Sequence, residues 1–540
     1  MVQIKDLLPA EAASAGAPFN GPHMDNSADW TSGYVVEVDY THGYYRELSP
    51  VLIDFTLLVA GFEPPARGSG RYLELGMGQG LSANIHAAAV EGECVGVDFN
   101  PSHAANAMQL AQASGSGARF FDDSFAQFAG RDMGEFDYIT LHGVWSWVSE
   151  ENRDVLVDII RHKVKVGGAV YISYNSLPGW ASAMPLRHLL TLHGKLGRAG
   201  ADGIVSSIDH AIEFGRKVAE VGARYYAATP GAKDRLDAIA DQNRRYLAHE
   251  YFNLDWLPMY FSEINQRLSS AKLHFTASAN LLDHVPGINT TAEQSALLAG
   301  VAHPVLRETV RDYILNQQFR KDLFTRGARR LADLDRQERL NDALVALTTP
   351  AADIAFDITA GLGALTLKQD IYGPLIESLS ARDYAPKRLG DLAEDPSLKR
   401  IGGASLLEAV TVLVGAGHAH PAQPGAAVEK ATPACARLNE HLVRRARVSE
   451  DVGFLASPVI GGGLQVSRFE QLFLLSRLGG ADKPEQWAQF AWDVLQRQNQ
   501  VLIKDGKPLA APQDNLDELT RQATALEQRR LPLLRALRVA

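Results

Sequence analysis

The sequence predicts an α/β protein with a doubly wound, mostly parallel Rossmann-like sheet in its first third, followed by mainly helical domains. Three observations lead to this prediction. Short apolar segments alternate with helical segments, a glycine-rich turn follows the first apolar segment of this alternation, and the periodicity becomes helical after Trp180. The short segments are almost wholly apolar, as strands buried on both faces of a sheet must be.

The alternating segments can be placed in order along the chain. An apolar helix is expected over residues 51–60, before Gly61 and the Pro64-Pro65 pair. The alternation that follows predicts strand 71–75, helix 81–90, strand 94–98, helix 103–113, strand 119–121, strand 137–141, helix 153–163 and strand 169–174. Because helices connect parallel strands across the sheet, we expect helices on both of its faces.

The remaining chain predicts further domains, because 540 residues are too many for one hydrophobic core. Helical periodicity over residues 206–221 and 304–324 indicates a helical domain after the sheet. We expect an irregular N-terminal arm in residues 1–30, the α/β domain in 31–190, the helical domain in 191–330, and a mostly helical C-terminal domain in 331–540. A winged-helix-like module is one interpretation of this last domain.

The composition narrows the classes of function. A formal charge of −10 argues against a broad surface for nucleic acids or anionic membranes. Without a bilayer-spanning apolar stretch or a secretion signal, we expect a cytoplasmic protein with no membrane insertion. The two cysteines, Cys94 and Cys435, form no CxxC or Cys/His cluster, and the His249-Glu250 pair is followed by Asn253 where a second histidine would bind zinc. We therefore expect no metal site.

The strongest local signal is Leu73-Glu74-Leu75-Gly76-Met77-Gly78-Gln79-Gly80, between the first strand of the alternation and its helix. Glycines let the backbone turn tightly and approach a ligand, and the following helix offers unbonded N–H groups. A dinucleotide-binding turn has the pattern GxGxxG. Here the third glycine comes one position early and Leu81 occupies the expected place, so the spacing disfavours a dinucleotide.

Acidic residues end the next two strands, where open α/β sheets bind ligands. Asp98 can accept hydrogen bonds from both hydroxyls of a ribose; its alternative role is a helix N-cap, although Asn100-Pro101 supplies a better cap. Asp123, which we prefer over Asp122, can accept the amine of adenine, and the following N–H can reach a ring nitrogen. The alternative for Asp123 is an ordinary solvated turn.

With the segment Lys163-Val164-Lys165-Val166-Gly167-Gly168, these elements resemble the class I S-adenosylmethionine-dependent methyltransferases over about residues 30–190. Three further segments resemble bacterial methyltransferases with a methyltransferase regulatory domain and extend the resemblance to about residue 330. This group includes the rickettsial protein lysine methyltransferases. The segments are Leu141-His142-Gly143-Val144-Trp145-Ser146-Trp147, Ser173-Tyr174-Asn175-Ser176-Leu177-Pro178-Gly179-Trp180 and Tyr246-Leu247-Ala248-His249-Glu250-Tyr251-Phe252-Asn253.

The resemblance implies S-adenosylmethionine as cofactor and S-adenosylhomocysteine as product. Gly76 and Gly78 would face the methionine part and Asp98 the ribose. Asp123 and Ser124 would face the adenine, while residues 40–45 fold over the pocket. The expected cofactor-binding residues are Tyr40, Tyr44, Glu74, Gly76, Met77, Gly78, Asp98, Phe99, Asp123, Ser124 and His142.

Methyl transfer from a sulfonium is an in-line displacement, so a target lysine must first lose its proton in a site that excludes water. An apolar aromatic channel lowers the pKa of that lysine and stabilises the methylated ammonium by cation–π attraction. The candidate residues are Trp145, Trp147, Tyr174 and Trp180 for the channel, His142 as a base or cofactor neighbour, and Asn175 to align the nucleophile. Plain core packing is the alternative for each of these aromatic residues and for His142.

Three functions remain. The first is methylation of a protein substrate, on lysine side chains. The second is methylation of a small metabolite or glycan, although the long chain beyond the catalytic domain is more than a small substrate needs. The third is a non-catalytic scaffold, which the intact glycine turn and Asp98 disfavour. We expect the helical domain to cover the pocket, and the oligomeric state stays open, a dimer included.

Overall fold

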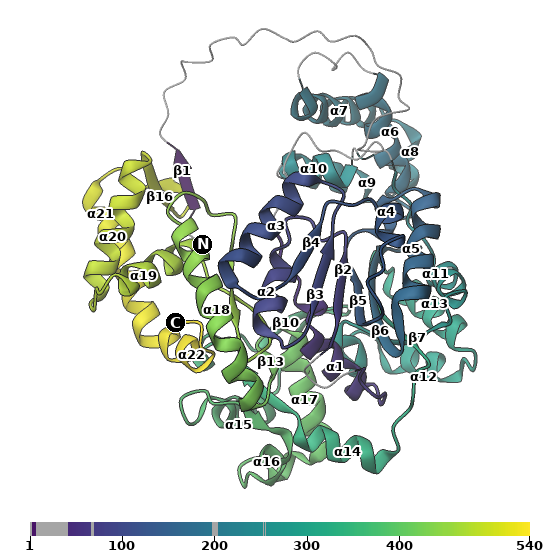
Figure 1. Ribbon diagram of the computed structural model, residues 1–540. Helices are drawn as coiled ribbons and strands as arrows, with labels where there is room; N and C mark the ends of the chain where they lie inside the picture. Colours follow the sequence, from purple (N-terminus) through teal and green to yellow (C-terminus); the bar gives the residue numbers. More distant parts are fainter. Residues whose placement is uncertain are drawn as a thin grey trace.

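The computed structural model describes residues 3–6, 42–65, 70–196, 203–229, 231–242, 244–251, 253 and 255–540. Its first half is built around a seven-stranded mixed sheet with the strand order β4-β3-β2-β5-β6-β8-β7 (Figure 1). Parallel pairs join β2 (Tyr72–Leu75), β3 (Cys94–Val97), β4 (Arg119–Phe121), β5 (Phe136–Leu141) and β6 (Val164–Asn175). The chain order reverses between β2 and β5, and open α/β sheets bind ligands outside the strand ends at such a switch point.

Helices cover both faces of this sheet. One face packs against α1 (Pro50–Val59), α2 (Leu81–Ala89) and α3 (Pro101–Ser114). The other face packs against α4 (Phe125–Ala129), α5 (Glu150–Lys163) and α11 (Phe261–Ser269). Tyr72 belongs to the first core and Leu73 to the second, because successive side chains of a strand point to opposite faces. The predicted doubly wound sheet is confirmed.

Two strands of the sheet lie in the stretch predicted to be helical. β7 (Leu273–Ser278) and β8 (Phe319–Arg326) extend the sheet as antiparallel strands, and β8 pairs with β6. The helix α13 (Pro304–Leu315) ends at Leu315, whereas the helical periodicity predicted a helix over residues 304–324. The expectation of a helix through residue 324 is therefore wrong, because the buried charges of Arg320 and Asp322 hide the apolar signature of an internal strand.

A separate group of helices follows β6. It comprises α6 (Met184–Leu196), α7 (Gly203–Glu220), α8 (Arg224–Ala228), α9 (Ala232–Ala240) and α10 (Arg244–Tyr251). They gather at one end of the molecule in Figure 1 and share a small core of their own, to which Leu190, Ile208, Leu236 and Leu247 contribute. A helical region is thus present, but the predicted boundaries 191–330 also enclose the two antiparallel strands.

The C-terminal region packs on the α2–α3 side of the sheet domain. Its long helix α18 (Gly425–Arg445) lies beside α2 and α3 (Figure 1). Arg437 Nε donates a hydrogen bond to the carbonyl oxygen of Ser114 over 2.7 Å, and Cys435 Sγ approaches that of Ala88 at 3.3 Å. A continuous hydrophobic core joins Leu52 and Ile85 to the C-terminal region. The two parts of the chain are therefore tightly packed together.

Within the C-terminal region, α15 (Gln369–Ser380), β12 (Lys387–Arg388), α16 (Leu389–Glu394), α17 (Gly403–Gly415) and β13 (Ala419–Ala422) follow one another. This helix–strand–helix–helix–strand order agrees with a winged-helix-like interpretation, which stays a prediction. The other elements are α12 (Ala292–Gly300), α14 (Asp333–Asp342), β9 (Leu344–Leu347), β10 (Asp357–Ala360), β11 (Gly363–Thr366), β14 (Phe454–Ser457), β15 (Gly462–Gln465), α19 (Arg468–Leu478), α20 (Pro484–Arg497), α21 (Pro512–Ala525) and α22 (Leu531–Ala536).

The arm predicted to be irregular contains one strand. β1 (Gln3–Asp6) pairs antiparallel with β16 (Gln500–Lys504), which also pairs with β17 (Lys507–Pro508). The expectation of a mostly irregular arm included no strand at these positions, because the pairing partner lies in the C-terminal region and leaves no local signal. Residues 7–30 of the arm lie outside the described residues.

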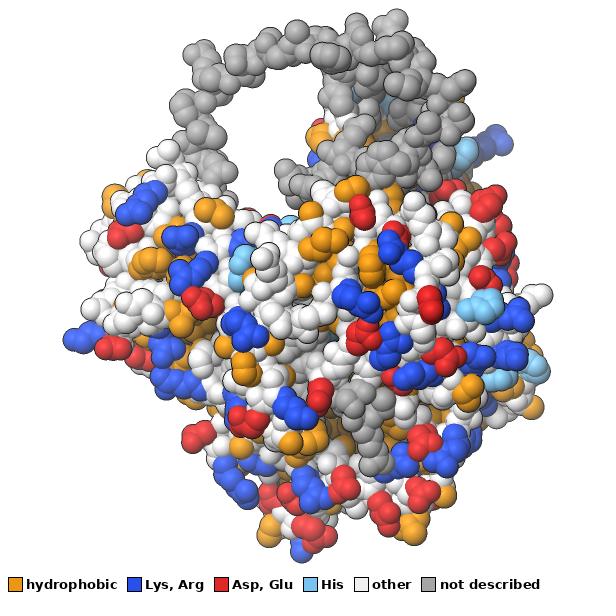
Figure 2. Space-filling model, viewed as in Figure 1, with side chains coloured by type: hydrophobic (Ala, Val, Ile, Leu, Met, Phe, Trp, Pro, Cys, Tyr) orange, Lys and Arg blue, Asp and Glu red, His pale blue; other side chains and the backbone are white. Residues whose placement is uncertain are grey.

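The face shown in Figure 2 carries lysine and arginine side chains interspersed with aspartate and glutamate, without a large region of one charge. This distribution agrees with the acidic composition and gives no broad basic surface on this face. Within the part of the chain that the structure describes, none of the helices combines the length and the apolar character needed to cross a bilayer.

Candidate active site

The glycine turn lies at the carboxyl end of β2. Gly76, Gly78 and Gly80 have φ values of 73°, 54° and 72°, a region that residues with a Cβ rarely adopt. A Cβ on Gly76 would also lie 2.4 Å from Val144 Cγ2, and one on Gly80 would lie 2.4 Å from Ala107 Cβ. Among the described residues no side chain caps α2 at Gly80, so the turn leaves N-terminal N–H groups of this helix to a ligand.

Asp98 is held rigidly at the end of β3. Its carboxylate accepts hydrogen bonds from the backbone N–H of Gly78 over 2.8 Å and of Asn100 over 3.1 Å, and His103 Nδ1 lies 3.0 Å away. The N-cap of α3 is Asn100, whose side chain accepts from Ser102 N over 2.9 Å. The cap role considered for Asp98 therefore belongs to Asn100, as its position before Pro101 predicted.

Asp123 and Ser124 occupy the end of β4. Asp123 lines the pocket and is bonded by Arg131, whose Nη2 donates to Asp123 Oδ1 over 2.8 Å, whereas Asp122 is exposed. Ser124 begins α4 with a capping box, so its N–H donates to Gln127 Oε1 over 2.8 Å. The N–H expected to reach a ring nitrogen is thus already bonded, to an exposed side chain that can move away.

These strand ends surround one pocket. Most of the expected cofactor-binding residues line it, namely Glu74, Gly76, Met77, Gly78, Asp98, Phe99, Asp123, Ser124 and His142. Further lining residues that the sequence did not single out include Tyr45, Gln79, Ser82, His103, Asn152 and Asp255. Because the predicted residues come from the ends of four strands, parallel pairing of the strands is what brings them together.

The segment before α1 closes one side of this pocket. Tyr45 N–H donates to Ser82 Oγ over 3.0 Å, and the Tyr45 ring stacks on His142 at 3.7 Å between centroids. Tyr44 does not line the pocket; its buried ring lies 4.9 Å from that of Phe454 in the C-terminal region. The tyrosine that lines the pocket is thus Tyr45 and not Tyr44 as expected, because adjacent residues of an extended chain point in opposite directions. Tyr40 lies outside the described residues.

His142 is a neutral imidazole in this pocket. Burial lowers its pKa to about 3; the charge of Glu47 partly opposes this shift, and the Lys321 cation adds a smaller lowering effect. Its Nδ1 lies 2.9 Å from the hydroxyl of Tyr171. A group with so low a pKa is a weak base for an ammonium proton, so the position favours a packed neighbour of the ligand over a general base.

Glu74 is the second buried titratable group of the pocket. Burial raises its pKa to about 8, with a further contribution from the charge of Asp98. Tyr72 donates its hydroxyl hydrogen to Glu74 Oε2 over 2.9 Å. Glu74 is therefore largely protonated at neutral pH.

The helical region reaches the pocket at Asn253 and Asp255. Trp147, from the segment after β5, lines the same pocket, and its ring centroid is 6.3 Å from that of Trp256. Arg187 lies over the Trp256 ring at 4.4 Å. The expected cover by the helical region is thus present at Asn253, and Asp255 adds a carboxylate to the pocket lining.

Three expected catalytic residues lie behind the pocket wall instead. Trp145 is fully buried and directs Nε1 at Met259 Sδ over 3.4 Å. Tyr174 donates its hydroxyl hydrogen to Asp322 Oδ2 over 2.7 Å. Asn175 N–H donates to Ser146 Oγ over 2.9 Å, and none of the three lines the pocket. Core packing and a buried ion cluster, rather than the pocket, account for these positions.

The chain is similar to several known proteins. The family described as "Methyltransferase domain" matches residues 73–168, and the one described as "Predicted methyltransferase regulatory domain" matches residues 243–326. An uncharacterised protein of Synechocystis is 38% identical over 514 residues, which cover 95% of this chain and 100% of that protein. An uncharacterised protein of Rickettsia prowazekii is 27% identical over 288 residues, 53% of this chain and 51% of that protein.

Among solved structures, PKMT2 from Rickettsia typhi in complex with AdoHcy superimposes with a TM-score of 0.66. The match covers 93% of this chain and 100% of that chain at 17% sequence identity. At this level of identity the similarity establishes a shared fold over nearly the whole chain.

Proposed function

The chain belongs to the class I S-adenosylmethionine-dependent methyltransferases with a methyltransferase regulatory domain, and we propose that it methylates lysine side chains of a protein. It is a methyltransferase, and S-adenosylmethionine is its cofactor. The lysine acceptor is the part of the proposal that needs its own test. The observation that carries it is the partly exposed part of the pocket lining, here called the pocket mouth, to which Trp147 and Asp255 both belong.

The pocket suits the cofactor at each strand end. In the proposal, the Asp98 carboxylate accepts the ribose hydroxyls and Asp123 accepts the adenine amine. A carboxylate has about four lone-pair positions, so the bonds that Asp98 already receives leave it able to accept more. The turn from Gly76 to Gly80 is a cradle that a Cβ would fill, as its close approach to Val144 indicates. When bound, the cofactor supplies a methyl group on a sulfonium.

The residues at the mouth suit a lysine acceptor. The Asp255 carboxylate attracts an ammonium from solvent, and the Trp147 ring stabilises a cation over its face. Deeper in the pocket, the neutral His142 and the Tyr45 ring offer no negative charge to an ammonium. Desolvation there lowers the pKa of a lysine, which favours its neutral, nucleophilic form. Asp255 can pass the released proton to water at the mouth.

The proposal can be tested by methyl transfer to proteins. Purified enzyme and S-adenosylmethionine with a tritiated methyl group are incubated with a bacterial lysate. We expect labelled protein that yields ε-N-methyllysine on hydrolysis, and no label after the lysines have been acetylated. Label confined to small molecules or to other amino acids would contradict the lysine acceptor while leaving the methyltransferase activity standing.

The variant Asp255→Asn tests the mouth separately. Removing this charge is expected to raise the KM for the labelled protein about tenfold, equivalent to about 1.4 kcal/mol, without changing cofactor affinity. The exposed Asp241→Asn, in the same helical region but away from the pocket, is the matched control. Equal KM values for the two variants would show that Asp255 does not contribute to binding of the acceptor.

The raised pKa of Glu74 predicts a pH dependence of cofactor affinity. Below about pH 8 the carboxyl is largely protonated, and a bound cation favours its ionised form, so binding releases a proton. The Kd for S-adenosylmethionine should therefore fall as pH rises toward 8, by up to about tenfold per pH unit. Calorimetric titrations across this range should show a flatter profile for Glu74→Gln. Identical profiles would show that Glu74 does not sense the ligand.

A further inference from the structure

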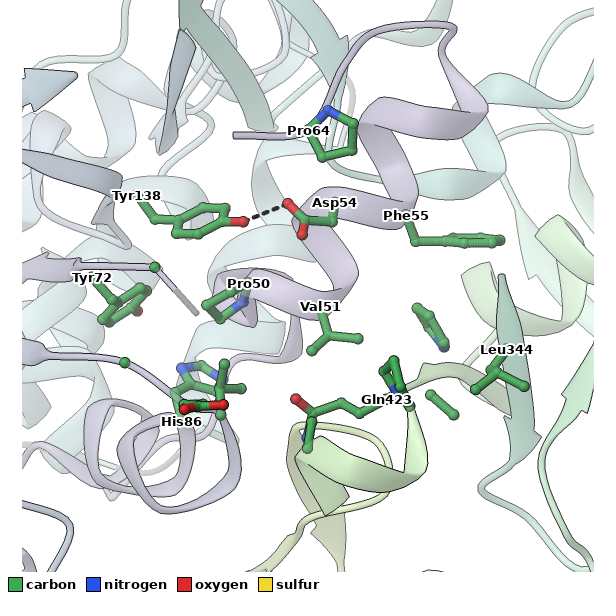
Figure 3. A pocket seen from close by; sticks show the side chains of 18 of the residues that line it. Pro50, Val51, Asp54, Phe55, Pro64, Tyr72, His86, Tyr138, Leu344 and Gln423 are labelled. Carbon is green, nitrogen blue, oxygen red and sulfur yellow. Dashed lines mark hydrogen bonds between the residues drawn. The ribbon is translucent and has the colours of Figure 1, made fainter. Parts of the chain in front are cut away.

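A second cavity lies between the sheet domain and the C-terminal region (Figure 3). Its volume is about 450 Å³. Its walls come from α1, from the end of α2, and from the segment between β13 and α18. The cofactor pocket lies at the beginning of α2, so the two spaces are at opposite ends of this helix.

Two buried polar side chains of this cavity have no hydrogen-bond partner among the described residues for some of their atoms. Both ring nitrogens of His86 are unpaired, and this residue is 2% exposed. Gln423 is 4% exposed, and its Oε1 is unpaired although its Nε2 donates to the carbonyl oxygens of Ala89 and Pro458. A buried polar atom without a partner costs about 1–3 kcal/mol, so a ligand that bonds to these atoms recovers part of this cost.

The rest of the cavity is mainly apolar. Figure 3 shows Pro50, Val51, Phe55 and Leu344 around the space, together with His86 and Gln423. Burial lowers the pKa of His86 to about 3, so its imidazole is neutral at physiological pH.

The charged side chains that line this cavity already have partners, some of them outside it: Arg339 pairs with Glu63 and Asp342 with Arg388. Lys430 binds Glu91 at 3.1 Å, and Arg71 binds Glu93 at 2.6 Å. Asp54 accepts the hydroxyl hydrogen of Tyr138 over 2.6 Å (Figure 3). A charged ligand would have to disrupt these pairs, whereas a neutral one would not.

We propose that this cavity is a binding site for a small neutral molecule that is mainly hydrocarbon and carries one hydroxyl or amide group. Its volume is in the range of ligand pockets, about 300–1,000 Å³, and such pockets occur preferentially at domain interfaces with apolar walls and a few polar groups. A hydroxyl or amide can donate to Gln423 Oε1 and bond to the neutral imidazole of His86.

Tyr72 connects this cavity with the cofactor pocket. The ring of Tyr72 is 5.8 Å from that of His86, and its hydroxyl donates to Glu74 Oε2 over 2.9 Å. Tyr72 therefore lines this cavity and donates a hydrogen bond to Glu74, which lines the cofactor pocket.

The test uses the full chain and the neutral fluorophore 1-N-phenylnaphthylamine, with S-adenosylhomocysteine in excess. We expect a saturable rise in fluorescence that S-adenosylhomocysteine does not prevent. Ala427→Trp, which fills the cavity from α18, should weaken binding at least about tenfold. Ala436→Trp, on an exposed face of the same helix, is the matched control. Circular dichroism and melting temperature establish that each variant folds, and Val51→Phe replaces Ala427→Trp should that variant not fold.

Displacement then tests the class of ligand. Decan-1-ol should displace the fluorophore at a concentration at least about tenfold lower than decanoate does. Unchanged binding in folded Ala427→Trp or Val51→Phe, or displacement by S-adenosylhomocysteine, would overturn the proposed site. Equal displacement by the alcohol and the carboxylate would overturn its neutral class. Because the readout uses neither cofactor binding nor methyl transfer, these outcomes are independent of the proposed function.

Discussion

Asp98→Ala is expected to weaken the binding of S-adenosylhomocysteine by at least about a hundredfold. A hydrogen bond to a charged group contributes about 1.5–3 kcal/mol, and in our proposal the Asp98 carboxylate accepts two of them from the ribose. The same carboxylate accepts from Gly78 N and Asn100 N, so its loss also loosens the glycine turn. Both effects act in the same direction on cofactor affinity.

Isothermal titration calorimetry measures this loss directly. Asp122→Ala is the matched control, because Asp122 is an exposed aspartate one residue away from the pocket residue Asp123. Asp98→Asn keeps the size of the side chain and one acceptor oxygen, and should bind with intermediate affinity. If Asp98→Ala retained the affinity of the wild type and a similar melting temperature, the proposed ribose contact would be wrong.

Arg320→Met should cause the largest loss of stability, about 3–5 kcal/mol. Arg320 is 4% exposed and its Nε donates to Asp322 Oδ2 over 2.8 Å. Its Nη1 donates to Asp312 Oδ1 over 2.5 Å and its Nη2 to Glu308 Oε2 over 3.0 Å. Methionine would leave the buried carboxylates of Asp312 and Asp322 without their cation, whereas the partly buried Glu308 would keep Arg311. Urea unfolding followed by tryptophan fluorescence measures the change.

The control is Arg329→Met, which removes an arginine whose side chain is 67% exposed and which pairs with Glu63. An exposed ion pair contributes about 0–1 kcal/mol, so this variant should unfold close to the wild type. Similar losses for both variants would contradict the special role of the Arg320 cluster.

The loss of stability caused by Arg320→Met should also grow as pH rises. Burial already raises the pKa of Asp312 to about 7 in the presence of Arg320. An acid whose pKa is higher in the folded state binds more protons when folded, so its contribution to stability falls as pH rises above its unfolded pKa. Without Arg320 this pKa rises further, and the stability lost between about pH 5 and 8 should be larger than in the wild type.

The parts of the site that could be predicted are those at the ends of successive parallel strands. Gly76, Gly78, Asp98 and Asp123 each follow a short apolar strand, and parallel pairing places such ends at one edge of the sheet. A local pattern is enough for these residues, because strand direction and pairing then determine where they lie. Among the described residues of the expected cofactor site, only Tyr44 lies away from the pocket.

The parts that could not be predicted depend on distant segments. Tyr44 and Tyr45 are adjacent tyrosines, and the packing of Tyr44 against Phe454 decides that Tyr45 faces the pocket. Tyr174 belongs to a segment with a family motif, but its hydroxyl bonds to Asp322 on a neighbouring strand. Asp255 reaches the pocket from the helical region without any motif of its own.

The sequence by itself determined the doubly wound sheet and the residues at its strand ends, because hydrophobic periodicity and glycine turns are local properties of the chain. Only the tertiary structure decided that β7 and β8 complete the sheet, that Tyr45 and Asp255 close the pocket, and that a cavity remains beside His86. These features arise where segments far apart in the sequence pack together. Charges such as those of Arg320 and Asp322 become compatible with a buried strand only once their partners are in place.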